Sequence, residues 1–297
     1  MDQNLLKLKP FVKWVGGKRD VIKKYLQFYL PKTYGNYYEV FAGGSAMLCY
    51  LLPKQAIIND INEDLIITYQ VVKDQLEQLI AKLDEHQNNH SIDYYYQIRK
   101  LVISDPVERA ARFIYLNKTC YNGLWRVNKK NQFNVPTNGK TNVILYEKTN
   151  LSNLNQYFNT RKIKFTNYSF QDWFLKYGQD LKGGDFVFID PPYDYEVGQK
   201  GFTSYSQSGF NQDQQQALAM YLKELDQRGI MWMHTNHNTN LIRTLYANFT
   251  VIECTTNRAI NRDGNKRKNS AQEVIIINYP INQAGIINNL KNNLEKV

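Results

Sequence analysis

The sequence contains no hydrophobic run long enough to cross a membrane, since no stretch approaches the roughly 18 consecutive apolar residues of a spanning helix. Its first residues, MDQNLLKLKPFVKW, carry charges where a secretory signal peptide needs an apolar core. Only three cysteines occur, far apart and without the paired spacing of a zinc site. We therefore expect an intracellular, reducing location, without a membrane anchor, a disulfide scaffold or a structural metal.

The positive charge is concentrated in two short segments. The formal net charge is +10. A composition of 43% hydrophobic and 22% charged residues is typical of a globular protein, and a length of 297 residues suits one large domain or two coupled ones. Segment 111–150 holds seven basic residues and one acidic residue, and segment 258–268 holds five and one, so the two segments carry the whole excess. Aromatic residues such as Tyr121 and Trp125 interrupt the first segment. Basic loops with interleaved aromatics favour binding to nucleic acid.

The hydrophobic pattern predicts strands alternating with helices. Short apolar, β-rich runs predict strands over 36–41, 55–60, 162–167, 185–190, 230–234, 249–254 and 273–279. Helical spacing of apolar residues predicts helices over 65–83, 92–102, 107–117 and 212–228. Between residues 118 and 150 the periodicity is lost, which indicates a loop-rich insertion. This alternation predicts an α/β fold built on a layered sheet.

A glycine turn, FAGG at residues 41–44, follows the first predicted strand. Open α/β sheets bind cofactors at the carboxyl ends of their strands, where glycines let the backbone approach a ligand. The next strand ends in Asp60, 17 residues after Gly43, close to the offset of about 20 residues at which an acidic side chain binds ribose hydroxyls. A glycine pair alone is more often an ordinary turn. Asp60 begins a run like a calcium loop, but Leu65 replaces the required glycine, so no metal is expected.

A second glycine pair lies in WVGGK at residues 14–18. A phosphate-binding loop would require Ser or Thr after the lysine, and Arg19 stands there, so that motif is excluded. Trp14 has the chemistry to stack on a purine, and Lys18 to reach a carboxylate, but the run alone is weak evidence.

The most specific motif is DPPY at residues 190–193, at the end of an apolar predicted strand. Two prolines end the strand and fix the backbone, so the carboxylate of Asp190, the carbonyl of Pro191 and the ring of Tyr193 project together. The alternative is a proline turn with a capping aspartate. The position at the cofactor end of the sheet favours a reaction site.

The order of FAGG, a basic insertion and DPPY resembles the Dam-type adenine-N6 DNA methyltransferases of the α group. The resemblance runs from about Pro10 to Tyr279 and is strongest in KWVGGKR, EVFAGGSAM, IIND, LNKTCYNGLWRVNKKNQFNVP and FIDPPY. It implies a Rossmann-like mixed-sheet core formed by residues 1–64 and 160–297, with a smaller, mainly helical and loop DNA-recognition domain inserted at 65–159. It also implies methyl transfer from S-adenosylmethionine to adenine, most often within GATC.

The resemblance assigns roles to individual residues. It implies cofactor contacts for Trp14, Gly16, Lys18, Phe41, Ala42, Gly43, Gly44, Asp60, Phe170 and Asp190. It implies that Asp190, Pro191, Pro192 and Tyr193 carry the reaction. DNA contacts are implied for Tyr121, Asn122, Leu124, Arg126, Asn128, Lys266, Arg267 and Lys268.

The expected mechanism is mainly positioning. The target base must leave the duplex, which costs roughly a few kcal/mol, and it then stacks on Tyr193. Asp190 and the Pro191 carbonyl accept hydrogen bonds from the amine and aim its lone pair at the methyl group, and no metal is required. Arg126 suits O6 and N7 of a guanine, with a phosphate contact as the alternative. The basic loop 258–268 is expected to hold the DNA backbone.

The expected partners are double-stranded DNA and a cognate restriction endonuclease of the same system. We expect a monomer without membrane association, in the cytoplasm with the nucleoid, encoded by a bacterium or a phage. The motif chemistry alone also fits amino methylation of cytosine N4 or of a protein glutamine, whose enzymes usually carry Ser and Asn, respectively, at the position of Asp190. A DNA-binding module without catalysis is a further alternative.

Two pairs of histidines carry weaker signals. His234 and His237 lie near a strand end, where paired metal ligation would be strained, so a role near the sheet edge or none is expected. His86 and His90 stand in the polar run DEHQNNH and are expected on a solvated helix face. After DPPY, the aromatic residues Phe202, Tyr205 and Phe210 either close over DNA or pack as an ordinary loop.

Overall fold

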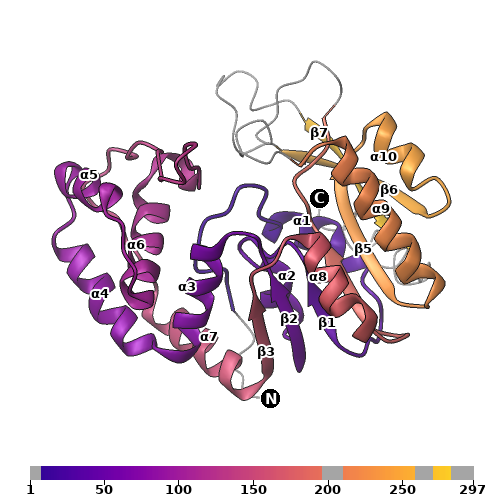
Figure 1. Ribbon diagram of the computed structural model, residues 1–297, viewed down its shortest axis with the longest axis horizontal. Helices are drawn as coiled ribbons and strands as arrows, with labels where there is room; N and C mark the ends of the chain where they lie inside the picture. Colours follow the sequence, from indigo (N-terminus) through magenta and orange to yellow (C-terminus); the bar gives the residue numbers. More distant parts are fainter. Residues whose placement is uncertain (1–7, 196–209, 258–269, 282–297) are drawn as a thin grey trace, which may run out of the picture. The chain divides into compact units, whose positions relative to one another are not determined.

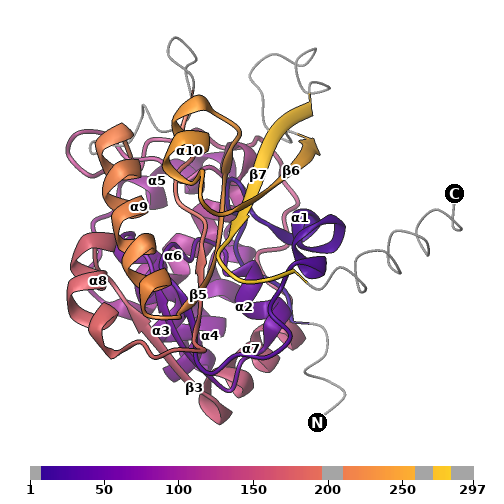
Figure 2. The same ribbon diagram turned by 90° about the vertical axis from the view of Figure 1, so that its right-hand side faces the viewer.

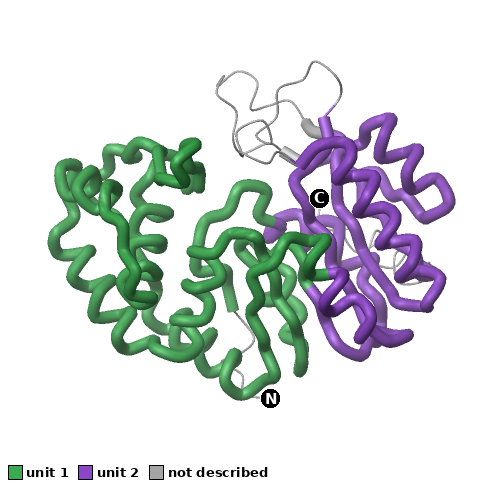
Figure 3. The backbone as a smooth tube through the Cα atoms, in the orientation of Figure 1, with its two compact units in different colours: residues 1–17, 39–173, 204–209 green, residues 18–38, 174–203, 210–297 purple. Residues whose placement is uncertain are grey.

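The computed structural model describes residues 8–195, 210–257 and 270–281. The chain divides into two compact units, coloured green and purple in Figure 3. Unit 1 comprises residues 1–17, 39–173 and 204–209, and unit 2 comprises residues 18–38, 174–203 and 210–297. The insert predicted at 65–159 falls within unit 1, and its status as a separate domain stays a prediction. The predicted sites at Lys266, Arg267, Lys268, Phe202 and Tyr205 lie outside the described residues.

The described strands form a mixed sheet (Figure 1). They are β1 (Tyr37–Glu39), β2 (Gln55–Asn59), β3 (Lys162–Thr166), β4 (Phe186–Ile189), β5 (Met231–His237), β6 (Thr250–Asn257) and β7 (Ser270–Ile277). Their hydrogen-bonded order is β3-β2-β1-β4-β5-β7-β6. β2 is parallel to β3 and β4 to β5, whereas β7 is antiparallel to β5 and β6. Each strand overlaps a predicted one, so the prediction of an α/β mixed sheet is confirmed.

Unit 1 adds a group of helices to β2 and β3. They are α2 (Ala46–Leu51), α3 (Glu63–Asp74), α4 (Leu76–Asn88), α5 (Ile92–Lys100), α6 (Pro106–Thr119) and α7 (Lys148–Thr160), and α8 (Phe170–Tyr177) begins here. Helices α3 and α7 pack on β3, while α4 and α5 pack on α6. α6 begins where the Asp105 side chain accepts a hydrogen bond from the Glu108 amide and Pro106 occupies the first turn, a strong start signal.

The single helix predicted over 65–83 is wrong. The structure has two helices there, α3 and α4, separated at Gln75, whose φ of −141° and ψ of 43° are not helical. Buried residues continue at helical spacing on both sides of the break, from Val72 to Leu79. Hydrophobic periodicity therefore does not reveal the change in backbone direction.

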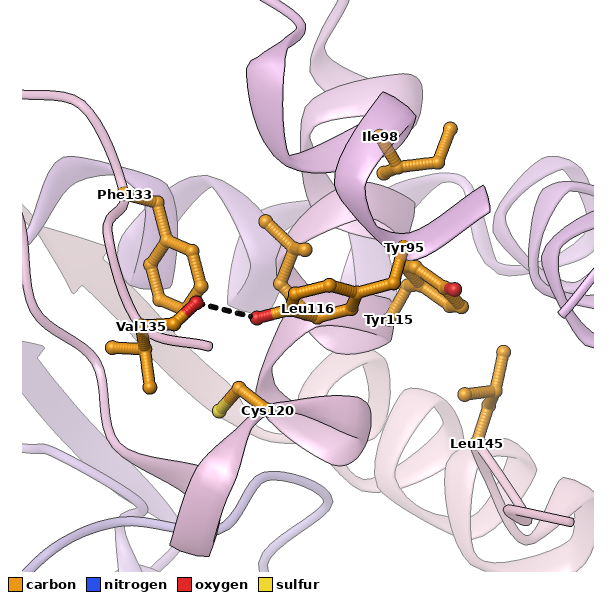
Figure 4. Close-up of a cluster of buried hydrophobic side chains, with 8 residues drawn as sticks. All are labelled: Tyr95, Ile98, Tyr115, Leu116, Cys120, Phe133, Val135 and Leu145. Carbon is orange, nitrogen blue, oxygen red and sulfur yellow. Dashed lines mark hydrogen bonds between the residues drawn. The ribbon is translucent and has the colours of Figure 1, made fainter. Parts of the chain in front are cut away.

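A hydrophobic cluster holds the loop-rich segment after α6 (Figure 4). The cluster consists of Tyr95, Ile98, Tyr115, Leu116, Cys120, Phe133, Val135 and Leu145. Within it the Tyr95 hydroxyl donates to the Val135 carbonyl at 2.8 Å. Apart from the short 3-10 turn η3 (Tyr121–Gly123) and two isolated bridges, residues 120–147 have no regular structure, as predicted. Side chains from α5 and α6, and not a β ladder, hold this segment in place.

The prediction that His86 and His90 lie on a solvated face is wrong. His86 Nδ1 lies 2.8 Å from the Tyr94 hydroxyl, and His90 Nδ1 lies 2.9 Å from the Tyr115 hydroxyl. The His86 ring also stacks on the Tyr115 ring at 5.0 Å. The polar sequence around α4 conceals this packing because the tyrosines come from α5 and α6. Burial lowers the pKa of His86, with Glu85 acting in the opposite direction.

Unit 2 contains the rest of the sheet and its own helices. They are α1 (Arg19–Lys24), η2 (Leu26–Phe28), η4 (Gly178–Asp180), α9 (Gln212–Gln227) and α10 (Asn240–Leu245). α9 runs alongside β5 in Figures 1 and 2, in the position predicted from its periodicity. It begins with a capping box in which Asn211 and Gln214 bind each other's backbone amides. In the described part of the chain, no helix has both the length and the apolar character needed to span a bilayer.

Candidate active site

The glycine loop, residues 41–45, follows β1 in unit 1. The Gly43 amide donates to Asp60 Oδ2 at 2.9 Å, and the Asn62 amide donates to Asp60 Oδ1 at 2.9 Å. The structure thus brings together the two residues that the 17-residue spacing linked. Burial raises the pKa of Asp60, and the backbone amides of Asn62, Gly43 and Ile61 lower it in part. Its carboxylate is held in one orientation by main-chain donors.

The shape of the glycine loop depends on Gly43. Its φ is +48°, and a Cβ atom there would lie 2.5 Å from Cδ1 of Trp14. This distance is too short for any side chain, so glycine is required both by backbone conformation and by the indole that covers the loop. Trp14 also stacks on Phe113 of α6, with ring centroids 6.5 Å apart. Gly16 likewise has a positive φ, +77°.

Asn59 holds the segments around the glycine loop. Its Nδ2 atom donates to the carbonyls of Val40 and Tyr168, each at 3.0 Å, and its Oδ1 atom accepts from the Tyr168 amide at 3.0 Å. The ring of Phe41 lies 5.8 Å from that of Phe170, the first residue of α8. Sequence reasoning did not assign Asn59 a role; its only signal is its position as the last residue of a buried strand.

The reaction loop, residues 190–194, follows β4 in unit 2. Ile189 pairs with His234 in the parallel ladder, which places the next residue, Asp190, beside Thr235. The Thr235 hydroxyl donates to Asp190 Oδ1 at 2.6 Å, and Lys18 Nζ lies 2.8 Å from the same oxygen. Lys18 is 5% exposed. A buried ammonium and a hydroxyl therefore fix one carboxylate oxygen of Asp190.

Tyr193 is held on two sides. Its hydroxyl donates to Glu273 Oε2 at 3.2 Å, and its ring meets the ring of His237 edge-on at 4.8 Å. Lys18 Nζ lies 4.8 Å from the centre of the Tyr193 ring. Burial raises the pKa of Tyr193 well above its usual range, and the charges of Asp190 and Glu273 raise it further. The phenol therefore stays protonated at neutral pH.

Sequence reasoning missed the polar side chains under the reaction loop. They are Gln215 of α9, Thr235 and Asn236 of β5, and Thr239 at the start of α10. β5 continues past its predicted end at residue 234, so a polar run that looks like a loop is a buried strand end. The available signal was the position of this run beside DPPY in a parallel sheet.

The histidines of β5 contact backbone oxygens. His234 Nδ1 lies 3.3 Å from the Ile189 carbonyl, and His237 Nδ1 lies 2.7 Å from the Asp194 carbonyl. Burial lowers the pKa of His234 to about 3, and the hydrogen bond with Ile189 acts in the opposite direction. Among residues 8–195, 210–257 and 270–281, no group of three or more His, Cys, Asp or Glu side chains is arranged to hold a metal.

The predicted DNA-reading residues lie in and after η3 of unit 1. Tyr121 is 46% exposed, and Asn122 has a left-handed φ of +56°. The Nε atom of Arg126 donates to Asn134 Oδ1 at 2.7 Å. Asn128 caps the turn that follows it, because its Oδ1 atom accepts from the Lys130 and Gln132 amides. Leu124 packs against the hydrophobic cluster.

Asn117, at the end of α6, ties this loop to the Trp14 segment. Its Oδ1 atom accepts from the Lys13 amide at 2.8 Å, and its Nδ2 atom donates to the carbonyls of Lys13 at 2.7 Å and Gly123 at 3.2 Å. Asn117 is fully buried. One side chain thus anchors both the residue before Trp14 and the turn that carries Tyr121 and Asn122.

The mixed α/β sheet is consistent with a Rossmann-like methyltransferase fold. A family model for D12 class N6 adenine-specific DNA methyltransferases matches residues 14–260. The chain therefore belongs to this family, and its reaction is methylation of adenine N6 in DNA. Cytosine and glutamine, the other acceptors that the motif allows, lie outside the family's description.

Relatives of known name match almost the whole chain. It is 35% identical over 285 residues to the type II methyltransferase M1.LlaDCHI of Lactococcus lactis subsp. cremoris, covering 94% of this chain and 98% of that one. It is 38% identical over 296 residues to the type II methyltransferase M.MjaIII of Methanocaldococcus jannaschii, covering 92% and 100%. It is 31% identical over 270 residues to the DNA adenine methylase of Escherichia coli K12, covering 88% and 92%.

Proposed function

We propose that the chain uses S-adenosylmethionine to methylate adenine N6 within GATC sites of double-stranded DNA, with the target base flipped out of the duplex. The observation that carries the reaction is the arrangement at Asp190. Lys18 and Thr235 both engage its Oδ1 atom, at 2.8 Å and 2.6 Å. The carboxylate is thus oriented before a base arrives.

The residues of the glycine loop fit the cofactor. Gly43 gives the loop its left-handed turn beneath the Trp14 indole, and the Asp60 carboxylate, oriented by two amides, retains lone pairs for ribose hydroxyls. Phe170 is assigned to the cofactor's adenine, and Phe41, whose ring lies 5.8 Å from that of Phe170, is assigned to its methionine end. When bound, S-adenosylmethionine supplies a methyl group activated by its positive sulfur. The predicted contacts of Trp14, Gly16, Lys18, Ala42 and Gly44 belong to this proposal.

The chain's own residues act on the acceptor base. Asp190 and the Pro191 carbonyl accept hydrogen bonds from the two amine N–H groups, which directs the nitrogen lone pair outward. Tyr193 stacks on the flipped ring, an interaction worth about 1–3 kcal/mol. Pro192 holds the backbone between them. Rate acceleration comes chiefly from this positioning.

The decisive experiment is methylation-sensitive sequencing of DNA from cells that express the chain or its Asp190→Ala variant. We expect methyladenine at GATC with the wild-type chain and none above background with the variant. Asp213→Ala, an exposed acidic residue of α9, is the matched control and should retain methylation. Near-normal methylation by Asp190→Ala would contradict the mechanism, and methylation of another site would contradict GATC.

Arg126 is the residue we assign to guanine recognition. Asn134 orients its Nε atom, and the terminal nitrogens of a guanidinium match O6 and N7 of guanine. Arg126→Ala should relax sequence preference, with a discrimination loss of about 1–3 kcal/mol at one base pair. Lys129→Ala, an exposed base in the same loop, should weaken binding to all sequences alike. Equal loss on every sequence with Arg126→Ala would indicate a phosphate contact instead.

The names of two relatives support a role in restriction and modification. We infer a cognate restriction endonuclease, against which the chain protects DNA in the cytoplasm of a bacterial or phage-infected cell. A single chain carries both the glycine loop and the reaction loop, which supports a monomer. Co-expression with a neighbouring nuclease gene tests the first inference, because host DNA should survive only with an active Asp190. Light scattering of the purified protein tests the second.

A further inference from the structure

We propose that Asn236 and Gln215 are positioning residues that set the orientation of Tyr193 through hydrogen bonds to the peptide groups on both sides of it. This inference rests on the proposed function. Both side chains are fully buried, so their amide groups carry a desolvation cost unless they are hydrogen-bonded. They bind one another and the reaction loop, and Asn236 also contacts His234 Nε2 at 3.4 Å and accepts from the His237 amide at 2.8 Å.

The two amides form a relay with one direction. The Asp194 amide donates to Asn236 Oδ1 at 2.8 Å, and Asn236 Nδ2 donates to Gln215 Oε1 at 3.1 Å. Gln215 Nε2 then donates to the Pro192 carbonyl at 3.0 Å. The relay therefore starts and ends on the backbone groups that flank Tyr193. Hydrogen bonds arranged head to tail in a buried site polarise and strengthen one another.

The reaction loop needs this outside support because of its own sequence. Pro191 and Pro192 have no amide hydrogen, so the loop cannot donate backbone hydrogen bonds at these positions. Side chains from α9 and β5 bind backbone groups that remain available, the Pro192 carbonyl and the Asp194 amide. Thr239 adds a further one, since its hydroxyl donates to Asp194 Oδ2 at 2.6 Å.

Variants that break the relay should transfer the methyl group more slowly without losing affinity for the cofactor. Asn236→Leu and Gln215→Leu replace each amide by an apolar side chain that cannot form hydrogen bonds, so the relay is lost and the ring of Tyr193 loses its fixed orientation. We expect each variant to lower the single-turnover methylation rate about tenfold or more, with cofactor affinity changed by less than about twofold. Because both break the same relay, the double variant should be no slower than either single one.

The experiment measures tritiated methyl transfer to DNA in single turnovers, cofactor affinity by calorimetry and Tm for each variant. Leu222→Ala is the matched control, since Leu222 is fully buried on the same face of α9, two helical turns from Gln215. It should lower Tm and leave the methylation rate of the folded protein unchanged. Asn236→Asp covers the case in which the leucine variants fail to fold, because it keeps the acceptor toward Asp194 and removes the donor toward Gln215.

The outcomes separate the two proposals. A slow rate for Asn236→Asp or the leucine variants, with normal cofactor affinity and no further loss in the double variant, supports the relay. Rates within about twofold of wild type, or losses that multiply in the double variant, would overturn it. If the wild-type chain itself transfers no methyl group to DNA, the proposed function fails instead.

Discussion

The glycine loop of unit 1 and the reaction loop of unit 2 each follow a strand, but they are held by different means. The glycine loop is shaped by backbone conformation and close packing, with Gly43 at a positive φ against the indole of Trp14. The reaction loop is held by side chains from distant elements, Gln215 and Asn236 above all. The close packing of the glycine loop leaves no room for an added atom at Gly43. The reaction loop, in contrast, can lose its hydrogen bonds one at a time, with a smaller effect for each. Substitutions in the two loops should therefore differ in size and kind.

The largest effect is expected in the glycine loop. Gly43→Ala forces a side chain into the left-handed region and within 2.5 Å of Trp14. Strain and overpacking together should weaken S-adenosylmethionine binding about 100-fold, measured by calorimetry. Gly139→Ala is the control, because Gly139 also has a positive φ, +73°, but open space around it. An unchanged affinity for Gly43→Ala would show that the loop is not shaped by this contact.

The next largest effect is expected from Lys18 in unit 2. Lys18→Met leaves the Asp190 carboxylate without its buried counter-ion, and kcat should fall about 30-fold. The measurement is steady-state methylation together with cofactor affinity. If Lys18 also contacts the cofactor, as the sequence predicts, the affinity falls too. Lys32→Met, an exposed lysine of the same unit, should leave both quantities unchanged. A normal kcat for Lys18→Met would show that the ion pair between Lys18 and Asp190 is not needed for methyl transfer.

A smaller effect is expected from Thr235. Thr235→Val keeps the shape of a buried side chain and removes the hydroxyl that donates to Asp190. One such hydrogen bond is worth about 1–1.5 kcal/mol, so kcat should fall about five- to tenfold with unchanged cofactor affinity. Thr235→Ser restores the hydroxyl and should recover most of the rate. Equal rates for the Val and Ser variants would contradict this role.

The last prediction concerns stability against acid and not the rate of methylation. Because burial lowers the pKa of His234 to about 3, the unfolded chain binds a proton there below about pH 6.5 and the folded chain does not. Folded-state stability from this residue is therefore lost as pH falls, by about 1.4 kcal/mol per pH unit in that window. His234→Gln lacks this loss, so its free energy of unfolding should approach that of wild type between about pH 7 and pH 4.5. Denaturant titrations measure both free energies of unfolding. A difference between wild type and His234→Gln that stays constant across this range would argue against a neutral buried imidazole.

The features that the sequence predicted are those with local signals. The apolar run before DPPY, the helical spacing of apolar residues in α9 and the spacing of Gly43 and Asp60 all lie within short stretches of chain. The roles of Gln215 and Asn236 could not be predicted, because each acts on a loop more than 20 residues away and polar residues in buried strands resemble loops. The tyrosine contacts of His86 and His90 were hidden for the same reason.

Three side chains that hold segment 120–147 in place bind its main-chain carbonyls. Tyr95 binds the carbonyl of Val135, His90 that of Lys140, and Gln87 that of Val143. A carbonyl is present whatever side chain its residue carries. The outward side chains of this segment can therefore be exchanged without unfastening it. If this segment reads DNA, as we propose, its target sequence can change one substitution at a time while the backbone stays in place.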